Sequence, residues 1–458
     1  MTRPNLLLLV IDSARADHFS CYGYDRPTTP NIDRLAEEGV RFEAAYSESS
    51  WTLPASFSLL TGLAPREHQA EAVRVLPAGI PSLPEVLQQQ GYATFGASAN
   101  EFLGPRSGLD RGFGTFTLAP QQEFWTRALY RYGPQRVGLA DWGGRALTGR
   151  FLRWVGEARQ PWFALIWHNE PHHPYCARWP FTRRFLRQRM SIPRQISLVC
   201  RMRRMLSIAP AMTARDLADM TGLYDGCLGY ADGLVGRTRR GLEARGQWAN
   251  TAVVVVADHG EMLGERGLLG HGRTADLYRP LVRVPLIVRA PGSLEGGAAS
   301  KAPVQLADVA QTLAALGGAE AGLSPTAAER LDLRDSASGS GRTTVVTERE
   351  PMSEHSVLSA KRKSPDFDFA PHLCHMTATV RDGWRLIHRE DGRHELYDLG
   401  TDPNEGRDLA STEPARLADL CRVVEDWRAR AQPHPATASL TKRDDAIVEQ
   451  RLQDLGYF

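Results

Sequence analysis

The sequence has no apolar run of the length that a transmembrane helix needs, and no marked excess of one charge. Its N-terminal apolar run, Leu6–Ile11, has only six residues and is followed at once by Asp12, without a small-residue cleavage site. This run therefore predicts a buried parallel strand rather than a signal peptide. The formal net charge of +2 identifies no class of partner.

Cysteine is scarce, with six residues in a chain of 458, and no two of them have the spacing of metal ligands. A chain of this length buries enough apolar surface to fold without disulfides. We therefore predict reduced thiols in a cytoplasmic protein. The cysteines are Cys21, Cys176, Cys200, Cys227, Cys374 and Cys421.

Acidic residues are absent between Glu170 and Asp216, where arginines are crowded and apolar residues lie among them. One interpretation is a solvated basic helical face. The other is a lid or docking surface for an anionic partner, which would be the substrate, an acidic carrier protein or a membrane surface. No recognisable nucleic-acid-binding module accompanies the stretch, so we expect no nucleic acid partner. The arginines are Arg178, Arg183, Arg184, Arg187, Arg189, Arg194, Arg201, Arg203, Arg204 and Arg215.

Short apolar runs alternate with helical patterns along much of the chain. This alternation predicts an α/β fold with a large mixed, mostly parallel sheet sandwiched by helices. The predicted strands are Leu6–Ile11, Tyr92–Ala97, Trp162–Trp167, Thr251–Ala257 and Val284–Arg289, and the predicted helices include Pro30–Glu38, Ser82–Gln90 and Leu217–Gly241.

The C-terminal part has a different pattern. Residues Gly322–Arg342, rich in small and charged residues, predict a surface loop, and Thr343–Thr347 predicts one more core strand. Three short strands with Asp-Gly turns then predict an antiparallel meander, followed by a helix. We expect a large domain over residues 1–375, with an Arg-rich insertion at about 176–215, and a small antiparallel subdomain with terminal helices over 376–458. The meander strands are Met376–Val380, Trp384–Arg389 and Glu395–Leu399, and the helix is Glu413–Ala431.

Polar residues follow the predicted strands directly: Asp12 follows the first, His168 the third and Asp258-His259 the fourth. Functional groups gather at the carboxyl ends of parallel strands, so we expect these side chains to lie near one another. Carboxylates with a neutral imidazole suit one divalent ion, Mn, Zn, Mg or Ca. Taken singly, Asp12 is equally typical of a helix N-cap. The dipeptide Asp258-His259, taken alone, is equally typical of a hydrogen-bonded Asp-His pair on the protein surface.

Residues Ser50–Gly62 place Thr52 before a Leu-Pro turn that leads into an apolar helix. Thr52 is either an N-cap or a hydroxyl held at a helix N-terminus, where aligned amides and the helix dipole favour anions. Next to a divalent metal ion, such a hydroxyl becomes an activated nucleophile.

Seven motifs, in one order along nearly the whole chain, resemble the sulfatase family. Among them, Leu59-Leu-Thr-Gly62 is similar to the end of that family's nucleophile motif, Cys-x-Pro-Ser-Arg followed by Leu-Leu-Thr-Gly. Counting back from it places Thr52 at the nucleophile position. The motifs are Pro4–Asp12, Pro30–Gly39, Leu59–Gly62, Trp167–Tyr175, Asp258–Gly264, Val284–Arg289 and Glu395–Glu405.

The resemblance implies an alkaline phosphatase superfamily fold and roles for individual residues. His271, with His172, would contact the ester or its leaving group as catalytic residues beside Thr52. Without the resemblance to the family, His172 would be equally typical of a loop histidine packed against its neighbours. His271 would be equally typical of a solvent-exposed turn residue. The implied metal ligands are Asp12, Thr52, Asp258 and His259, and the implied substrate-binding residues are Asn100, His168, His172 and His271.

The sequence departs from the family around the nucleophile. Sulfatases need a Cys or Ser there, which is oxidised to formylglycine, and Thr52 cannot form that aldehyde. The motif's Arg is Ser56, the usual second Asp is Ser13, and a family Lys and His are absent near Ser98–Leu103, where Asn100 is a partial substitute. These departures resemble relatives with a Thr nucleophile, such as phosphoethanolamine and phosphoglycerol transferases, although those are membrane-anchored.

We therefore predict a metal-dependent hydrolase or transferase that attacks phosphate (di)esters or sulfate esters through Thr52, and we favour a phosphodiesterase or phosphotransferase. The loss of pocket cations favours a monoanionic ester. One alternative is a sulfate-ester hydrolase that works without formylglycine. The other is a catalytically inactive binding protein with the sulfatase fold, against which the joint retention of Thr52 and the three metal-ligand positions argues.

Overall fold

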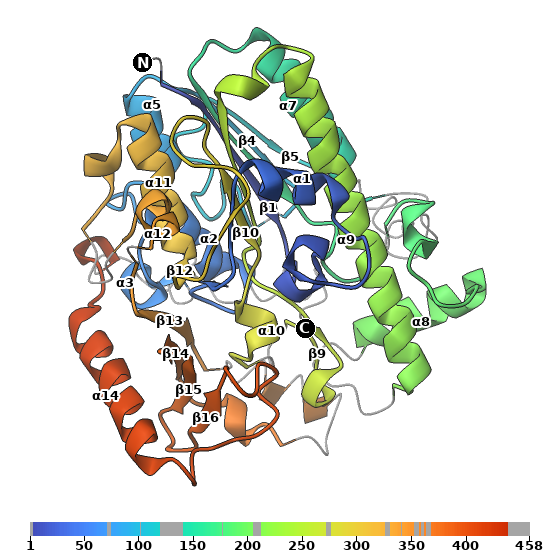
Figure 1. Cartoon of the computed structure of the whole chain (residues 1–458), viewed down its shortest axis with the longest axis vertical. Coiled ribbons are helices and arrows are strands. Elements are labelled where there is room, and N and C mark those ends of the chain that lie inside the picture. Colours follow the sequence, from blue (N-terminus) through green and yellow to red (C-terminus); the bar gives the residue numbers. More distant parts are fainter. Residues whose placement is uncertain are drawn as a thin grey trace.

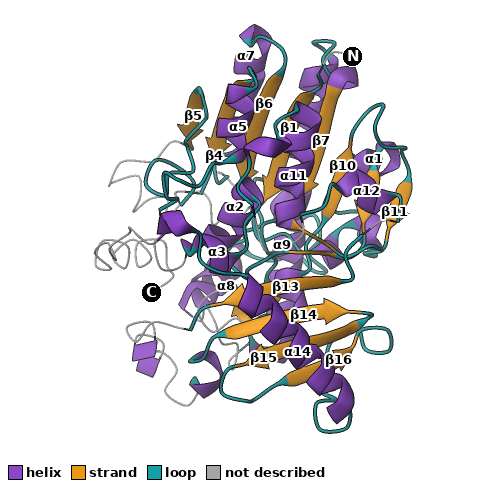
Figure 2. Cartoon of the chain, turned by 90° about the vertical axis from the view of Figure 1, so that its left-hand side faces the viewer, coloured by secondary structure: helices purple, strands orange, loops and turns teal. Residues whose placement is uncertain are grey.

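The computed structural model shows a large sheet covered by helices, beside a smaller sheet that carries one long helix (Figures 1 and 2). The described residues are 3–70, 75–100, 102–119, 141–175, 177–204, 212–271, 276–325, 330–339, 341–351, 357–358, 361–362 and 368–437. Cys176 and residues 438–458, where terminal helices are predicted, lie outside them, as does the Cys200 side chain. The cysteines Cys21, Cys227, Cys374 and Cys421 are free thiols.

The central sheet has eight strands. In sheet order they are β11 (Ala298–Ser300), β2 (Val40–Phe42), β10 (Leu286–Arg289), β7 (Thr251–Val256), β1 (Asn5–Ile11), β6 (Trp162–His168), β4 (Ala93–Ser98) and β5 (Thr115–Leu118). β1 pairs in parallel with β6 and β7, whereas β10 runs antiparallel to β7 and β2. β1, β6 and β7 are buried along their whole length, as continuous apolar runs are in a sheet covered on both faces.

Helices cover both faces of this sheet, which confirms the predicted fold class. In Figure 1, α2 (Thr52–Thr61), α5 (Leu83–Gln89) and α11 (Leu306–Gly317) lie to one side, and α1 (Pro30–Glu38), α7 (Gly144–Glu157) and α9 (Ala214–Glu243) to the other. α5 begins where predicted because Ser82 and Glu85 form a capping box. The short helices are α3 (Pro65–His68), α10 (Arg279–Val282) and α12 (Leu333–Ala337).

The small antiparallel sheet and its helix are also confirmed. Its strands, in order, are β13 (Thr344–Arg349), β14 (Met376–Arg381), β15 (Trp384–Arg389) and β16 (Glu395–Asp398), and α14 (Pro414–Arg430) packs on them (Figure 2). The two smallest sheets pair β3 (Ala45–Tyr46) with β12 (Val304–Gln305), and β8 (Met262–Leu263) with β9 (Leu269–Gly270).

Two predictions about the region before this sheet are wrong. Thr343–Thr347 does not join the central sheet, because it forms β13 and pairs with β14, with Val345 opposite Val380. Its β-branched residues predict a strand but not the partner of that strand. Residues Gly322–Arg342 are not all loop, since α12 forms there with Asp332 as its N-cap. The small sheet thus takes its first strand from within residues 1–375, and the division at 375 stays a prediction.

The Arg-rich segment contains α8 (Ile192–Arg204) and packs beside α9. Part of its charge is neutralised, because Arg194 and Arg201 pair with Asp216 at 3.2 Å, near the start of α9. Arg183, Arg184, Arg187 and Arg189 are exposed, and Trp179 in the same segment is 69% exposed. Among the described residues, no helix has both the length and the apolar character needed to cross a bilayer.

Candidate active site

Two adjacent strands end at the same edge of the central sheet and bring Asp12 and Asp258 together. β1 and β7 pair with Val10 opposite Val256, so the residues after each strand lie side by side. Asp12, Asp258 and His259, which we call the carboxylate cluster, are fully buried and offer ligand atoms within 4.8 Å of one another. The three predicted metal ligands therefore meet at one point, as expected at the carboxyl ends of parallel strands.

The backbone turns sharply after each acid. Ser13 has a φ of 58°, a conformation uncommon outside glycine, and its amide donates to Asp258 Oδ1 at 3.1 Å. The Ser13 hydroxyl donates to Asp12 Oδ1 at 2.8 Å. In the second turn, a Cβ on Gly260 would lie 2.0 Å from the carbonyl oxygen of Pro280, so only glycine fits. These turns hold the two carboxylates together.

Two donors fix the other oxygen of Asp12. Asn100 Nδ2 donates to Asp12 Oδ2 at 2.9 Å, and Trp167 Nε1 donates to the same atom at 3.0 Å. Such contacts orient a metal-ligating carboxylate. Asn100, predicted to bind substrate, therefore contacts a predicted metal ligand. No role was predicted for Trp167. The one feature of the sequence that could have indicated a role is its position directly before His168.

Thr52 is the first residue of α2, a helix that is buried along its whole length. Its Oγ1 lies 3.1 Å from His259 Nε2. His259 Nδ1 lies 2.9 Å from the Gly260 carbonyl oxygen and donates its proton there, so the Nε2 lone pair faces the Thr52 hydroxyl. Ser56, at the position of the family's Arg, donates its own hydroxyl to the Thr52 carbonyl at 2.5 Å. Thr52 thus touches the carboxylate cluster, and Ser56 bonds back to its helix.

The electrostatics of the carboxylate cluster fit a cation. Burial, and then the neighbouring Asp12 carboxylate, raise the pKa of Asp258 well above its usual range. Burial lowers the pKa of His259 to about 4, so its imidazole is neutral at neutral pH. Among the described residues, Asp258 Oδ2 accepts no hydrogen bond. Two buried carboxylates with an unsatisfied oxygen, a neutral imidazole and a hydroxyl form a donor set that suits a divalent cation.

A second group of histidines adjoins this cluster. His172, His173 and His271, which we call the three-histidine cluster, are buried and offer ligand atoms within 4.8 Å of one another. The His271 ring centroid lies 4.3 Å from that of His259. Glu261, also buried, places Oε2 3.2 Å from His271 Nδ1. His172 and His271 therefore lie beside the carboxylate cluster, and their contact with the ester stays a prediction. His173 and Glu261 lie there too, and no role was predicted for either, although each belongs to one of the quoted motifs.

Two charged groups near His271 are Glu261 and Arg349. Burial, and then Asp12, raise the pKa of Glu261 well above its usual range. Burial, the neighbouring imidazoles and the Arg349 guanidinium lower the pKa of His271 well below its usual value. Arg349 is nearly buried, and its Nη1 donates to Ser50 Oγ at 3.0 Å. Arg349 is a cation near the nucleophile position, and no role was predicted for it, because the predicted strand, Thr343–Thr347, ends before Arg349.

His168 belongs to neither cluster. It is buried at the end of β6, with Nδ1 3.8 Å from Glu170 Oε2, and its ring nitrogens make no hydrogen bond to the described residues. Burial lowers its pKa to about 4. Its backbone carbonyl accepts from the Asp12 amide at 2.9 Å. His168 therefore supports Asp12 through the backbone, and its contact with substrate stays a prediction.

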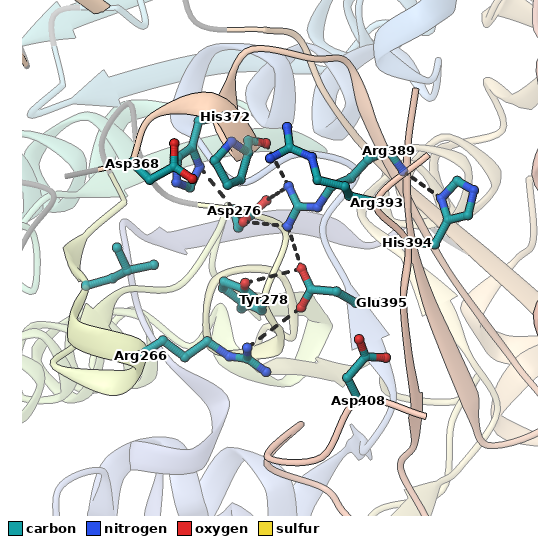
Figure 3. Close-up of a pocket in the computed structure, with 12 residues that line it drawn as sticks. Arg266, Asp276, Tyr278, Asp368, His372, Arg389, Arg393, His394, Glu395 and Asp408 are labelled. Atoms are coloured by element: carbon teal, nitrogen blue, oxygen red, sulfur yellow. Dashed lines mark hydrogen bonds and ion pairs between the residues drawn. The ribbon is translucent and has the colours of Figure 1, made fainter. Parts of the chain in front are cut away.

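A separate cavity of about 470 Å³ is lined by residues of the small sheet, among them Arg389 and Glu395, and by Arg266, Leu268, Asp276 and Tyr278 (Figure 3). In it, Arg389 pairs with Asp276 at 2.8 Å and with Glu395 at 2.6 Å. Arg266 lies 3.7 Å from Glu395. None of the predicted site residues is among the described residues that line it. Because Arg266 and Arg389 are paired with carboxylates, this cavity is an ionic junction rather than a place for an anionic ester.

Known proteins resemble this chain in sequence and in fold. The family model described as Sulfatase matches residues 4–319. The uncharacterized sulfatase YidJ of Escherichia coli is 26% identical over 93% of this chain and 86% of that protein. The choline-sulfatase of Rhizobium meliloti is 25% identical over 100% of this chain and 93% of that protein. The structure of the phosphonate monoester hydrolase of Agrobacterium radiobacter superposes with a TM-score of 0.72 at 23% identity, covering 93% of this chain and 96% of that one.

Proposed function

Because this chain belongs to the sulfatase family of the alkaline phosphatase superfamily, and is thus an enzyme that acts on sulfate or phosphate esters, we propose that it attacks its ester with Thr52. The observation that carries this proposal is the 3.1 Å contact between Thr52 Oγ1 and His259 Nε2, beside the buried carboxylates of Asp12 and Asp258. Within that class we favour a phosphodiesterase or phosphotransferase.

The chemistry of threonine supports a hydroxyl nucleophile. Formylglycine is an aldehyde made by oxidising a Cys or Ser side chain. The Cβ of Thr52 carries a methyl group as well as the hydroxyl, so the same oxidation would give a ketone. Thr52 would therefore react through its own oxygen, and the covalent intermediate would be a phosphate or sulfate ester of Thr52, which for a phosphate diester keeps the second ester group of the substrate.

The residues around Thr52 are those that would hold a divalent cation: Asp12, Asp258 and His259, with Thr52 itself. Such a cation would lower the pKa of the Thr52 hydroxyl and neutralise charge on the oxygens of the ester. The N-terminus of α2 adds its amides and dipole to the stabilisation of the same oxygens. In-line attack by Thr52 expels the leaving group, and water or an alcohol acceptor then releases the product from Thr52.

His271 and His172 lie next to the nucleophile's partner His259, where they would meet the leaving oxygen. Burial and the neighbouring imidazoles keep His271 neutral at neutral pH. A neutral imidazole is a weak acid, so we favour orientation of the leaving oxygen by these histidines over its protonation by an imidazolium.

The balance of charge favours a monoanionic ester. Ser56 stands where the family has an Arg, and the family's Lys is absent near Ser98–Leu103, so two cations are missing, against one acid that is missing at Ser13. Arg349 is a nearby cation. A phosphate diester or a sulfate ester carries one negative charge, whereas a phosphate monoester carries nearly two at neutral pH.

The exposed part of the Arg-rich segment supports a second, separate proposal about a partner. Arg183, Arg184, Arg187 and Arg189 are exposed, and Trp179 beside them is 69% exposed. An exposed indole among cations is typical of a membrane interface, where the ring enters the headgroup region. We therefore favour an anionic membrane surface over an acidic carrier protein as the partner.

Side-by-side rates with an aryl phosphate diester, monoester and sulfate test the proposed reaction. We expect the diester to be the fastest substrate, and all three activities to be lost in Thr52→Ala. If the sulfate is fastest and the rate still needs Thr52, the alternative of a sulfatase without formylglycine replaces our preference. If Thr52→Ala keeps its activity, the nucleophile is assigned wrongly.

A further inference from the structure

We infer that His388, His394 and Cys421, which we call the Cys-His cluster, bind one divalent cation of the zinc class. The inference goes beyond the proposed function, because none of these residues belongs to the candidate active site. The three side chains offer ligand atoms that all lie within 4.8 Å of one another. Neighbouring ligand atoms of a tetrahedral zinc ion lie roughly 3.5 Å apart, so small side-chain rotations would bring all three onto one ion.

Strand pairing brings the two histidines together on one face of the small sheet. β15 and β16 pair with Leu386 opposite Leu396. His388 and His394 each stand two positions closer to the turn that joins these strands. Residues two apart in a strand project from the same face, and opposite residues are neighbours. The two imidazole ring centroids accordingly lie 4.5 Å apart.

The helix α14 supplies the thiol. Leu420 and Val424 of α14 form one apolar cluster with the leucines of β15 and β16 named above, so this helix covers the face that carries the histidines. Cys421 packs against the same apolar cluster and is a free, partly buried thiol. A cation held by the Cys-His cluster would therefore join two strands to a helix, and its binding would stabilise the small sheet.

Both imidazoles have the protonation state that a metal ligand needs. Burial, and then His394 and Arg428, lower the pKa of His388 to about 4, and burial also lowers the pKa of His394. The buried Nδ1 of His388 makes no hydrogen bond to the described residues. His394 Nδ1 accepts from the Arg389 amide at 3.3 Å (Figure 3). This bond is long, so a cation would compete well for the same lone pair.

The charges around the Cys-His cluster would balance a zinc ion. Burial, and then the Glu425 carboxylate, raise the pKa of Cys421, so a cation would displace the thiol proton and bind the thiolate. Glu425 is exposed one helical turn after Cys421, where its carboxylate or a water molecule would take the fourth position. Arg428, the cation that acts on His388, is itself paired with Glu390 at 3.3 Å.

The ligand types of the Cys-His cluster give it a signal of its own. Thiolate and imidazole select Zn²⁺ and Co²⁺ over Mg²⁺. A thiolate bound to Co²⁺ absorbs strongly in the near ultraviolet through charge transfer from sulfur to metal, which oxygen and nitrogen ligands do not produce. Neither the carboxylate cluster nor the three-histidine cluster contains a cysteine. The absorption therefore reports a cysteine ligand, whatever ions bind at the candidate active site.

Titration of the reduced, chelator-stripped full chain with Co²⁺ tests this inference. We expect the charge-transfer absorption to saturate at one thiolate-bound Co²⁺ per chain, and Zn²⁺ to displace it. Cys421→Ser should remove the absorption and lower the zinc count per chain, measured by mass spectrometry, by one. His394→Gln keeps the thiol but loses a direct ligand, so the Kd for Co²⁺ should rise by at least about 100-fold.

Two control variants should keep the absorption. Cys374→Ser removes another partly buried thiol, just before β14, and Asp258→Asn alters the carboxylate cluster. Far-UV circular dichroism and the melting temperature in chelator should match those of the parent, which shows that Cys421→Ser folds. If it does not fold, Cys421→Ala is measured in the same way.

Three results would overturn the inference. They are the lack of a charge-transfer absorption in the parent, its survival in Cys421→Ser, and an unchanged Kd in His394→Gln, since a thiol without its histidines would then account for the binding. Each of these results leaves the proposed function as it stands, because that proposal is tested separately by the activity of Thr52→Ala.

Discussion

The hydroxyl oxygen of Thr52 lies 3.1 Å from Nε2 of His259, although the two residues are 207 positions apart in the chain. Thr52 is not the N-cap of α2, because Trp51 occupies that position and Thr52 is the first helical residue. The Thr52 hydroxyl therefore does not cap the helix, and it contacts His259 of the carboxylate cluster instead. The helix N-terminus, the neutral imidazole and two buried carboxylates meet at this hydroxyl.

Removing a ligand of the carboxylate cluster should remove its metal. In Asp258→Asn, one anionic oxygen donor is lost from a buried site, so we expect less than about 0.2 equivalents of Mg²⁺ per chain after dialysis. Added Mg²⁺ should raise the melting temperature of the parent and leave that of the variant unchanged. Full metal content in Asp258→Asn would show that Asp258 is no ligand.

Removing a donor to Asp12 should weaken the same site without abolishing it. Asn100→Ala deletes the 2.9 Å hydrogen bond to Asp12 Oδ2, and Trp167→Phe deletes the 3.0 Å one. Outer contacts of this kind typically change metal affinity by about 10–100-fold. We expect the Kd for Mg²⁺, measured by calorimetry, to rise by roughly tenfold in each variant. A Kd equal to that of the parent in both variants would mean that these contacts do not orient the ligand.

Much of the fold could be predicted from the sequence because local patterns decide it. Continuous apolar runs such as Leu6–Ile11 have no polar face and must be buried in a sheet covered on both sides. The helix over Pro30–Glu38 is found with the predicted bounds, since Pro30 fits the first turn and Gly39 follows the last residue. The β13 strand was placed in the wrong sheet, because its pairing with β14 is set by long-range packing that Thr343–Thr347 does not encode.

At the candidate site, too, local patterns predict one part, and long-range packing decides the rest. Asp12 and Asp258-His259 could be placed together, because both follow apolar strands that end at one edge of the sheet. Trp167, Glu261 and Arg349 could not be assigned contacts. Each reaches its partner through the tertiary fold, as in the hydrogen bond from Trp167 to Asp12 across neighbouring strands.

Stability should depend on pH through a buried carboxyl outside the site. Burial raises the pKa of Glu48 from 4.5 to about 8, and its Oε1 accepts from the Ala307 amide at 2.8 Å. Because the folded pKa lies above the unfolded one, this contribution to stability is complete below pH 4.5 and is lost as pH rises through 8. Glu48→Gln keeps an acceptor and does not titrate. Its free energy of unfolding relative to the parent should therefore increase by roughly 1–4 kcal/mol between pH 5 and pH 9.

Urea unfolding at pH 5, 7 and 9 measures this difference. The exposed Glu37→Gln serves as the control and should track the parent at every pH. A constant difference between Glu48→Gln and the parent across this range would mean that Glu48 does not titrate there.

The exposed arginines should bind an anionic surface. We expect sedimentation with vesicles that contain an anionic phospholipid, little sedimentation with zwitterionic vesicles, and loss of binding as salt increases. Trp179→Ala with Arg183→Glu and Arg187→Glu should abolish binding. The control reverses two exposed arginines elsewhere, Arg106→Glu and Arg145→Glu, and should bind as the parent does. Equal loss in both variants would show that net charge alone, rather than this segment, decides binding.

The covalent intermediate on Thr52 tests the central claim most directly. An aryl phosphate diester is mixed with the enzyme, the reaction is quenched in acid during turnover, and the peptide containing Thr52 is analysed by fragmentation mass spectrometry. We predict that Thr52 carries the phosphoryl group with the second ester group of the substrate still attached, because attack on a diester expels only one alcohol. This adduct should be absent from Thr52→Ala, whose kcat should be at least about 10⁴-fold lower. Turnover in Thr52→Ala near the parent rate, or a phosphorylated residue other than Thr52 in the parent, would contradict the account.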